Sequence, residues 1–156
     1  MRTAVPVVAL AIALCVGCAG SGGGDNDGGG GGGGGCTPPE TPSVTLSGNV
    51  QPIMNRSCAV NGCHVGAVPA GELALSTGQT FPQTVDVPSV QSNLLRVKPG
   101  APDQSYLVRK IEGGPNIFGT IMPQGCPGSP LNGAQCLSSD DMAAIRQWIS
   151  ECALDN

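Results

Sequence analysis

The chain has 156 residues, a formal net charge of −4 at pH 7, eight cysteines and only 3% aromatic residues. Because its eleven acidic residues outnumber its seven basic ones, the composition argues against nucleic-acid binding. The many cysteines in a short chain favour an oxidising compartment, in which thiols pair as disulfides.

Residues 1–17 have the pattern of a secretory signal peptide. A charged Arg2 precedes an apolar run over residues 4–16, which is too short to span a bilayer. The run ends in a small residue followed by Cys18, and this resembles a bacterial lipoprotein signal. The resemblance implies that Cys18 is lipidated and anchors the protein to a lipid bilayer of a bacterial cell envelope, on the periplasmic or outer-membrane face. Ordinary cleavage after Ala19 is the alternative.

Residues 18–35 continue from Cys18 almost entirely as glycine, so they predict a flexible linker that cannot bury apolar surface. A phosphate-binding glycine loop is excluded because no strand precedes the segment, no helix follows it and it contains no lysine. Residues 36–156 remain, about 120 residues that suit a single domain.

The first element of this domain is a predicted helix that begins near Ser47 and runs to Arg56. Val50, Ile53 and Met54 have the spacing of one helical face, and Pro52 is tolerated only in a first turn.

Residues 57–64 contain Cys58, Cys63 and His64, the only histidine of the chain. The common attachment signature of c-type haem is C-x-x-C-H, in which two cysteine sulfurs bind the porphyrin and the histidine binds the iron. Here the spacing is C-x4-C-H, and Asn61-Gly62 can form a tight turn that lets the two extra residues bulge outward. The segment therefore predicts one covalently attached haem c.

Three other interpretations of this segment stay open. Cys58 and Cys63 could form a small disulfide, provide half of a zinc site, or be unrelated thiols in a loop. Zinc requires four ligands, and the cysteines that remain outside the signal segment are distant and form no C-x-x-C pair. A disulfide gives no reason for His64 to follow Cys63 directly. A cysteine nucleophile with His64 as its base is disfavoured by the oxidising compartment.

The segment between residues 66 and 95 is interrupted repeatedly by glycine and proline. Its short apolar pieces at residues 72–75 and 84–87 predict brief strands or a wrapping loop.

A short helix is predicted after the Pro-Gly turn at residues 99–100. Asp103 can cap it, Leu107, Val108 and Ile111 form its apolar face, and the glycines at residues 113–114 end it. Four basic residues lie within fifteen positions here. We expect a solvated face, with haem propionates or an acidic protein as the alternative partners; the four residues are Arg96, Lys98, Arg109 and Lys110.

The last helix follows Ser138 or Ser139, either of which can cap it, and has acidic residues in its first turn. One continuous apolar stripe predicts its buried face, formed by Met142, Ile145, Trp148, Ile149 and Cys152. The expected fold class is therefore mainly all-α, with long irregular loops.

Four cysteines remain outside the signal segment and the haem motif, and they predict two disulfides with three possible connectivities. We expect Cys126–Cys136 to close a loop rich in proline and glycine, and Cys36–Cys152 to join the two ends of the domain.

An electron-carrying haem needs a second iron ligand, and methionine sulfur is the usual partner of histidine. Met142 belongs to the apolar stripe, and Met54 lies only ten positions before His64. Met122 precedes a proline, which favours an extended loop from which its side chain can project. We therefore expect Met122 as the second ligand, with core packing as its alternative role.

These elements, in this order, resemble the cytochrome c family, and more narrowly the monohaem domains of exported bacterial lipoproteins. Residues 50–53, Val-Gln-Pro-Ile, lead into C-x4-C-H, and residues 97–107 precede the Met-Pro pair. The resemblance implies a cytochrome c-like fold whose first and last helices cross around one haem c. It also implies attachment at Cys58 and Cys63, with His64 and Met122 as iron ligands.

The expected function is that of a membrane-tethered electron carrier, not an enzyme, which exchanges electrons with redox partner proteins. One alternative is a haem domain with an open iron site for peroxide or gas chemistry. Another is a haem-free surface lipoprotein, held by disulfides, with a binding or scaffolding role.

Overall fold

The computed structural model describes residues 35–156. The predicted signal peptide, the lipidation site at Cys18 and nearly all of the glycine linker lie outside the described residues. The described part is mainly helical, as expected, and its only β-structure consists of isolated bridges. Within residues 35–156, no helix has the length and apolar character needed to cross a bilayer.

The predicted first helix is present as a π-helical turn, η1 (Leu46–Val50), that continues into α1 (Gln51–Ser57). Pro52 has no N–H to donate and lies in the first turn of α1, where the π-helical turn passes into the α-helix. Val50, Ile53 and Met54 are buried, as their spacing predicted.

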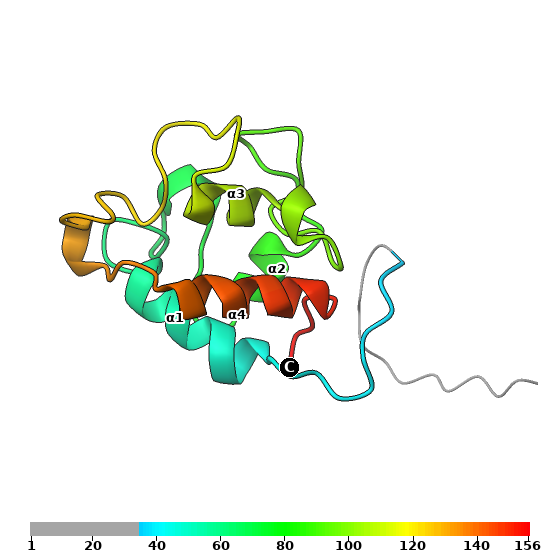
Figure 1. Ribbon diagram of the computed structural model, residues 1–156. Coiled ribbons are helices and arrows are strands. Elements are labelled where there is room, and N and C mark those ends of the chain that lie inside the picture. The colour runs from blue at the N-terminus through cyan, green and yellow to red at the C-terminus, as the bar shows by residue number, and fades with distance from the viewer. Residues whose placement is uncertain (1–34) are drawn as a thin grey trace, which may run out of the picture.

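Helix α4 (Ser139–Ser150) is the main support of the domain. Ser138 and Asp141 form a capping box at its start, and Trp148 and Ile149 are buried along its length. It packs on η1 on one side and on α3 (Tyr106–Glu112) on the other (Figure 1). The predicted stripe is therefore the contact surface that joins the two ends of the domain.

The predicted cap of the middle helix is wrong. Asp103 lies in a separate 3₁₀ turn, η3 (Pro102–Gln104), and its carboxylate accepts a hydrogen bond from Arg146 at 2.5 Å. Ser105 occupies the cap position without a side-chain capping bond. The end of α3 agrees with the prediction, because Gly113 adopts the left-handed conformation that stops the helix.

The segment between residues 66 and 95 is a wrapping loop with two short helical turns, η2 (Ala70–Glu72) and α2 (Thr80–Thr84). Its pairing with the rest of the chain is limited to isolated bridges, such as Val85 with Val97. Of the two predicted alternatives, the loop is therefore the correct one, and α2 was not predicted.

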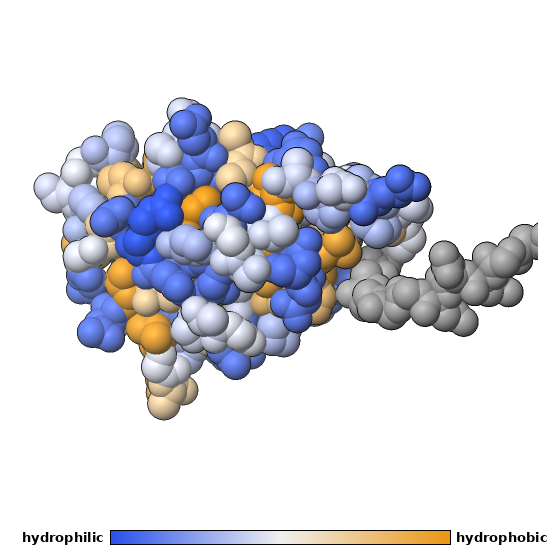
Figure 2. All heavy atoms as spheres, turned by 90° about the horizontal axis from the view of Figure 1, so that it is seen from below, coloured by the Kyte–Doolittle hydropathy of each residue, from blue (hydrophilic) through white to orange (hydrophobic). Residues whose placement is uncertain are grey.

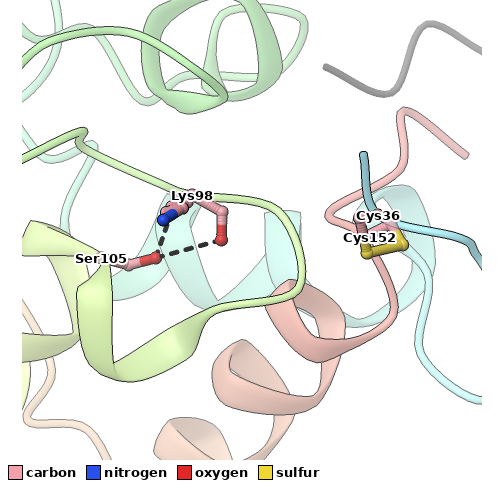
Figure 3. Close-up of a disulfide and its surroundings, with 4 residues drawn as sticks. All are labelled: Cys36, Lys98, Ser105 and Cys152. Atoms are coloured by element: carbon pink, nitrogen blue, oxygen red, sulfur yellow. Dashed lines mark hydrogen bonds between the residues drawn. A yellow bond between two sulfur atoms is a disulfide. The ribbon is translucent and has the colours of Figure 1, made fainter. Parts of the chain in front are cut away.

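Both disulfides join the pairs preferred from the sequence, Cys36–Cys152 and Cys126–Cys136. The first lies beside the turn that contains Lys98 and Ser105 (Figure 3). A Cβ atom at Gly100 of this turn would lie 2.8 Å from the Cys36 sulfur, so only glycine fits there. Two disulfides indicate an oxidising, extracytoplasmic environment.

Hydrogen bonds reinforce the joined ends. The Glu151 carboxylate accepts from the backbone N–H groups of Ser43 and Val44 and from the Ser43 hydroxyl, at 2.6–3.1 Å. Asn156 accepts from Leu46 N through its side chain and from Ser47 N through its carbonyl. The outer surface of this region, seen from below in Figure 2, is mostly hydrophilic with small separate hydrophobic patches.

The two disulfides should differ in their contribution to stability, because they close loops of different length. The sequence separations are 116 and 10 residues. Chain-entropy estimates are about 4.7 kcal/mol for a 100-residue loop and about 3 kcal/mol for a 15-residue loop. Urea unfolding should therefore show that the Cys36→Ser/Cys152→Ser variant loses roughly 1–2 kcal/mol more than Cys126→Ser/Cys136→Ser. Equal losses would contradict this ranking.

Acid should lower the stability of the domain, because it protonates the Glu151 carboxylate that connects the two ends of the chain. Hydrogen bonds from the Ser43 hydroxyl and then from Gln147 lower the pKa of the Glu151 carboxyl from 4.5 to about 2. A depressed pKa gives stability that is present above pH 4.5 and is lost as the pH falls towards 2. Thermal unfolding between pH 6 and pH 2 should show a smaller loss for Glu151→Gln than for the wild type, whereas Glu40→Gln, at an exposed position, should follow the wild type.

Candidate functional site

A cavity opens between the end of α1, the wrapping loop, α3 and the loops that follow α3. It contains about 1150 Å³ of empty space, its open mouth included. Its walls are largely apolar and are formed by Leu73, Leu75, Leu107, Ile111, Pro123, Leu131 and Ala134. The four predicted haem residues also line it, namely Cys58, Cys63, His64 and Met122.

The haem motif forms a compact turn at the end of α1. Cys63 N donates to Val60 O at 3.0 Å, His64 N donates to Cys58 O at 3.1 Å, and Gly62 has a φ of +79°. The longer C-x4-C spacing is therefore taken up within one turn, and both cysteines still reach the same cavity.

Both cysteines are free thiols, so the alternative of a Cys58–Cys63 disulfide is absent from the structure. Cys58 is buried and Cys63 is half-buried. Burial raises the pKa of the Cys58 thiol to about 12, and the neighbouring Cys63 adds to this rise. Cys58 therefore remains a protonated thiol at neutral pH.

The imidazole of His64 is oriented by one hydrogen bond. Its Nδ1 lies 3.1 Å from the Leu73 carbonyl oxygen, and a carbonyl can only accept, so Nδ1 carries the proton. Burial lowers the pKa of His64, and backbone hydrogen bonding to Leu73 and Ala70 partly opposes this shift. The ring is therefore held neutral with its Nε2 lone pair available to a metal.

Met122 is the methionine that the structure brings to the cavity. Its backbone N–H donates to Lys110 O at 2.8 Å, which ties it to the end of α3. Met54 is fully buried in the hydrophobic core and does not line the cavity. Met142 packs partly buried against the core and borders a second hollow, which Met122 also lines.

The basic residues do not form the solvated face that we expected. Arg96 and Lys110 are buried and line the cavity, whereas Lys98 is exposed and Arg109 is half-buried. Arg96 can be buried because the backbone of the wrapping loop provides hydrogen-bond acceptors. Its guanidinium donates to the carbonyl oxygens of residues 71, 72 and 83. The lining contains no aspartate or glutamate, so these two cations favour an anionic occupant.

Residues 123–136, which we call the strap, form a cavity wall that the sequence did not predict. The turn η4 (Leu131–Gly133) brings Asn132 over the haem motif, with its Nδ2 3.5 Å from the Cys63 sulfur. A Cβ atom at Gly62 would lie 3.1 Å from the same nitrogen. The Cys126–Cys136 disulfide was the available signal of a closed loop, but it could not show which surface the loop covers.

One buried polar atom in the cavity lacks a partner. Among residues 35–156, Ser57 Oγ is the buried side-chain polar atom without a hydrogen bond, and Ser57 lines the cavity. Buried polar groups in native proteins are nearly always hydrogen-bonded, so Ser57 Oγ is free to bond a polar group of an occupant of the cavity. The same residues include no group of three or more His, Cys, Asp or Glu side chains that could hold a metal ion.

The two thiols should differ in reactivity in the haem-free protein. Iodoacetamide attacks the thiolate, and Cys58 is buried with a pKa of about 12, so Cys63 should be alkylated at least tenfold faster at pH 8. Peptide mass spectrometry after timed quenching measures both rates. Equal rates, or a Cys58–Cys63 disulfide in the folded protein, would contradict the structure.

Comparison with known proteins adds little to this description. No protein-family model matches the chain, and no curated protein matches it. Among solved structures, hydrazine synthase of Kuenenia stuttgartiensis matches with a TM-score of 0.44 and 19% identity over 71% of this chain. The match covers 16% of the hydrazine synthase chain. This similarity is too low to indicate a shared fold or activity.

Proposed function

We propose that residues 36–156 form a monohaem c-type cytochrome domain of the cytochrome c family, which carries electrons in the bacterial cell envelope. The observation that carries this proposal is that the four residues predicted to bind haem line the same cavity. Met122 follows His64 by 58 positions, yet both line the cavity that also contains Cys58 and Cys63.

The residues present fit haem c in chemistry as well as in place. Cys58 and Cys63 are unpaired although the other four cysteines of the described domain form disulfides. Each thiol can add across one vinyl group, its sulfur forming the bond to carbon and its hydrogen passing to the neighbouring carbon. The apolar walls suit a porphyrin ring, and Arg96 and Lys110 suit its carboxylates.

The proposed iron ligands are His64 Nε2 and Met122 sulfur. The Leu73 carbonyl holds the His64 ring in the tautomer that this role requires. When bound, haem would supply a one-electron iron couple. Two protein ligands would exclude small molecules from the iron, which favours electron exchange with redox partner proteins over substrate chemistry. The predicted lipid at Cys18 would tether the domain to the envelope membrane.

The decisive experiment is expression in a host with a c-type maturation system. We expect a haem that remains attached after denaturation, seen in a pyridine haemochrome spectrum and as one haem mass added to the chain. A bare chain mass would reject the proposal and favour the haem-free disulfide-linked lipoprotein. A high-spin ferric spectrum would instead favour the open-site alternative.

Met122 can be tested in the same material. Met122→Ala should remove the weak methionine-to-iron charge-transfer band and lower the reduction potential by on the order of 0.1 V, within the roughly 0.8 V that axial ligands span. Met142→Ala is the matched control, because Met142 is also half-buried but does not line the haem cavity. An unchanged spectrum in Met122→Ala would reject this ligand.

A further inference from the structure

We infer that Lys110 is a positioning residue for Met122. Together with Tyr106 it would hold residues 113–122, which we call the Met122 loop, in the shape that brings Met122 into the cavity. This inference rests on the proposed function, since it concerns the second ligand of the proposed haem.

The Lys110 ammonium is the main attachment point of the loop. Lys110 is only 8% exposed, and its Nζ donates to the carbonyl oxygens of Phe118 at 2.8 Å and Thr120 at 2.5 Å. The Lys110 carbonyl accepts the N–H of Met122 at 2.8 Å. One residue of α3 thus binds the middle and the end of the loop.

Tyr106 adds a further contact from the same face of α3, since it lies four positions before Lys110. Its side chain is buried, and its hydroxyl accepts the N–H of Phe118 at 2.9 Å. The backbone amide and carbonyl of Phe118 are therefore both held by side chains of one rigid helix.

Apolar packing holds the loop only in part. Ile117 and Ile121 are half-buried, but Phe118 is 68% exposed, and Gly119 and Thr120 are also exposed. A loop with little buried apolar surface depends on specific hydrogen bonds for its order. The contacts to Lys110 and Tyr106 are therefore the ones that determine where Met122 lies.

Backbone carbonyls of the loop compensate the burial of Lys110. Within residues 35–156 its ammonium forms no ion pair with a carboxylate. A buried cation requires hydrogen-bond acceptors, and the loop carbonyls supply them. The order of the loop and the burial of Lys110 thus depend on each other. A lysine that served only solubility would be exposed and would not need these contacts.

Lys110→Met tests the inference, because methionine keeps the length and apolar stem of the side chain and removes its donors. In hydrogen exchange of the haem-free protein, amides of residues 113–122 should exchange on the order of tenfold faster than in the wild type, as expected for the loss of such bonds. In the haem-loaded protein, the methionine-to-iron band should weaken and the reduction potential should fall, as expected also for Met122→Ala.

Lys98→Met is the matched control. It removes the same charge from an exposed lysine, whose Nζ donates to Gln104 Oε1 at 2.6 Å, away from the Met122 loop. It should leave exchange, band and potential as in the wild type. Tyr106→Phe is a milder second variant, which removes one acceptor and should produce a smaller change in the same direction.

Failure of the inference differs from failure of the proposed function. A folded Lys110→Met protein with unchanged loop exchange and an unchanged band would overturn the role of Lys110. Equal effects of Lys98→Met would do the same, because they would indicate a general effect of charge. A wild-type protein without haem rejects the proposed function before any variant is compared.

Discussion

The packing of α4 against η1 and α3 is the contact on which the rest of the structure depends. It brings the last helix of the chain onto the first, and it buries Trp148 and Ile149 between them. The Cys36–Cys152 disulfide and the hydrogen bonds of Glu151 hold the same two ends together. The joined helices form a rigid frame, and the long loops are attached to it.

The cavity walls depend on this frame in a different way. They are mostly loops, and buried polar side chains order them. Arg96 binds three carbonyl groups of the wrapping loop and α2, and Lys110 binds two of the Met122 loop. The strap is closed by the Cys126–Cys136 disulfide and reaches Cys63 through Asn132. A small chain with few aromatic residues thus uses hydrogen bonds to shape the loops around its cavity.

The arrangement suits the proposed electron carrier in two respects. The thiols and the imidazole lie on one continuous turn at the end of α1, so a group attached there would be fixed close to the rigid frame. The methionine comes from a separate loop, so its contact with the same group can be tuned without disturbing that attachment. The two buried cations beside an apolar pocket would accommodate a ligand that is apolar in its body and anionic at its edge.

The sequence by itself determined the features that depend on neighbouring residues or on simple periodicity. These include the three main helices, a serine cap at the start of the last helix, the end of α3 at its glycines and the grouping of Cys58, Cys63 and His64. It also favoured, among three possible connectivities, the pairing of Cys36 with Cys152, because this pair joins the two ends of the domain. Only the tertiary structure decided what depends on long-range contacts. It directed Asp103 to Arg146 instead of a helix cap, buried Arg96 and Lys110, brought Met122 to the cavity and laid the strap over Cys63. The physical reason is that the partners of these groups are mainly backbone carbonyls and side chains of distant segments, whose positions no local pattern encodes.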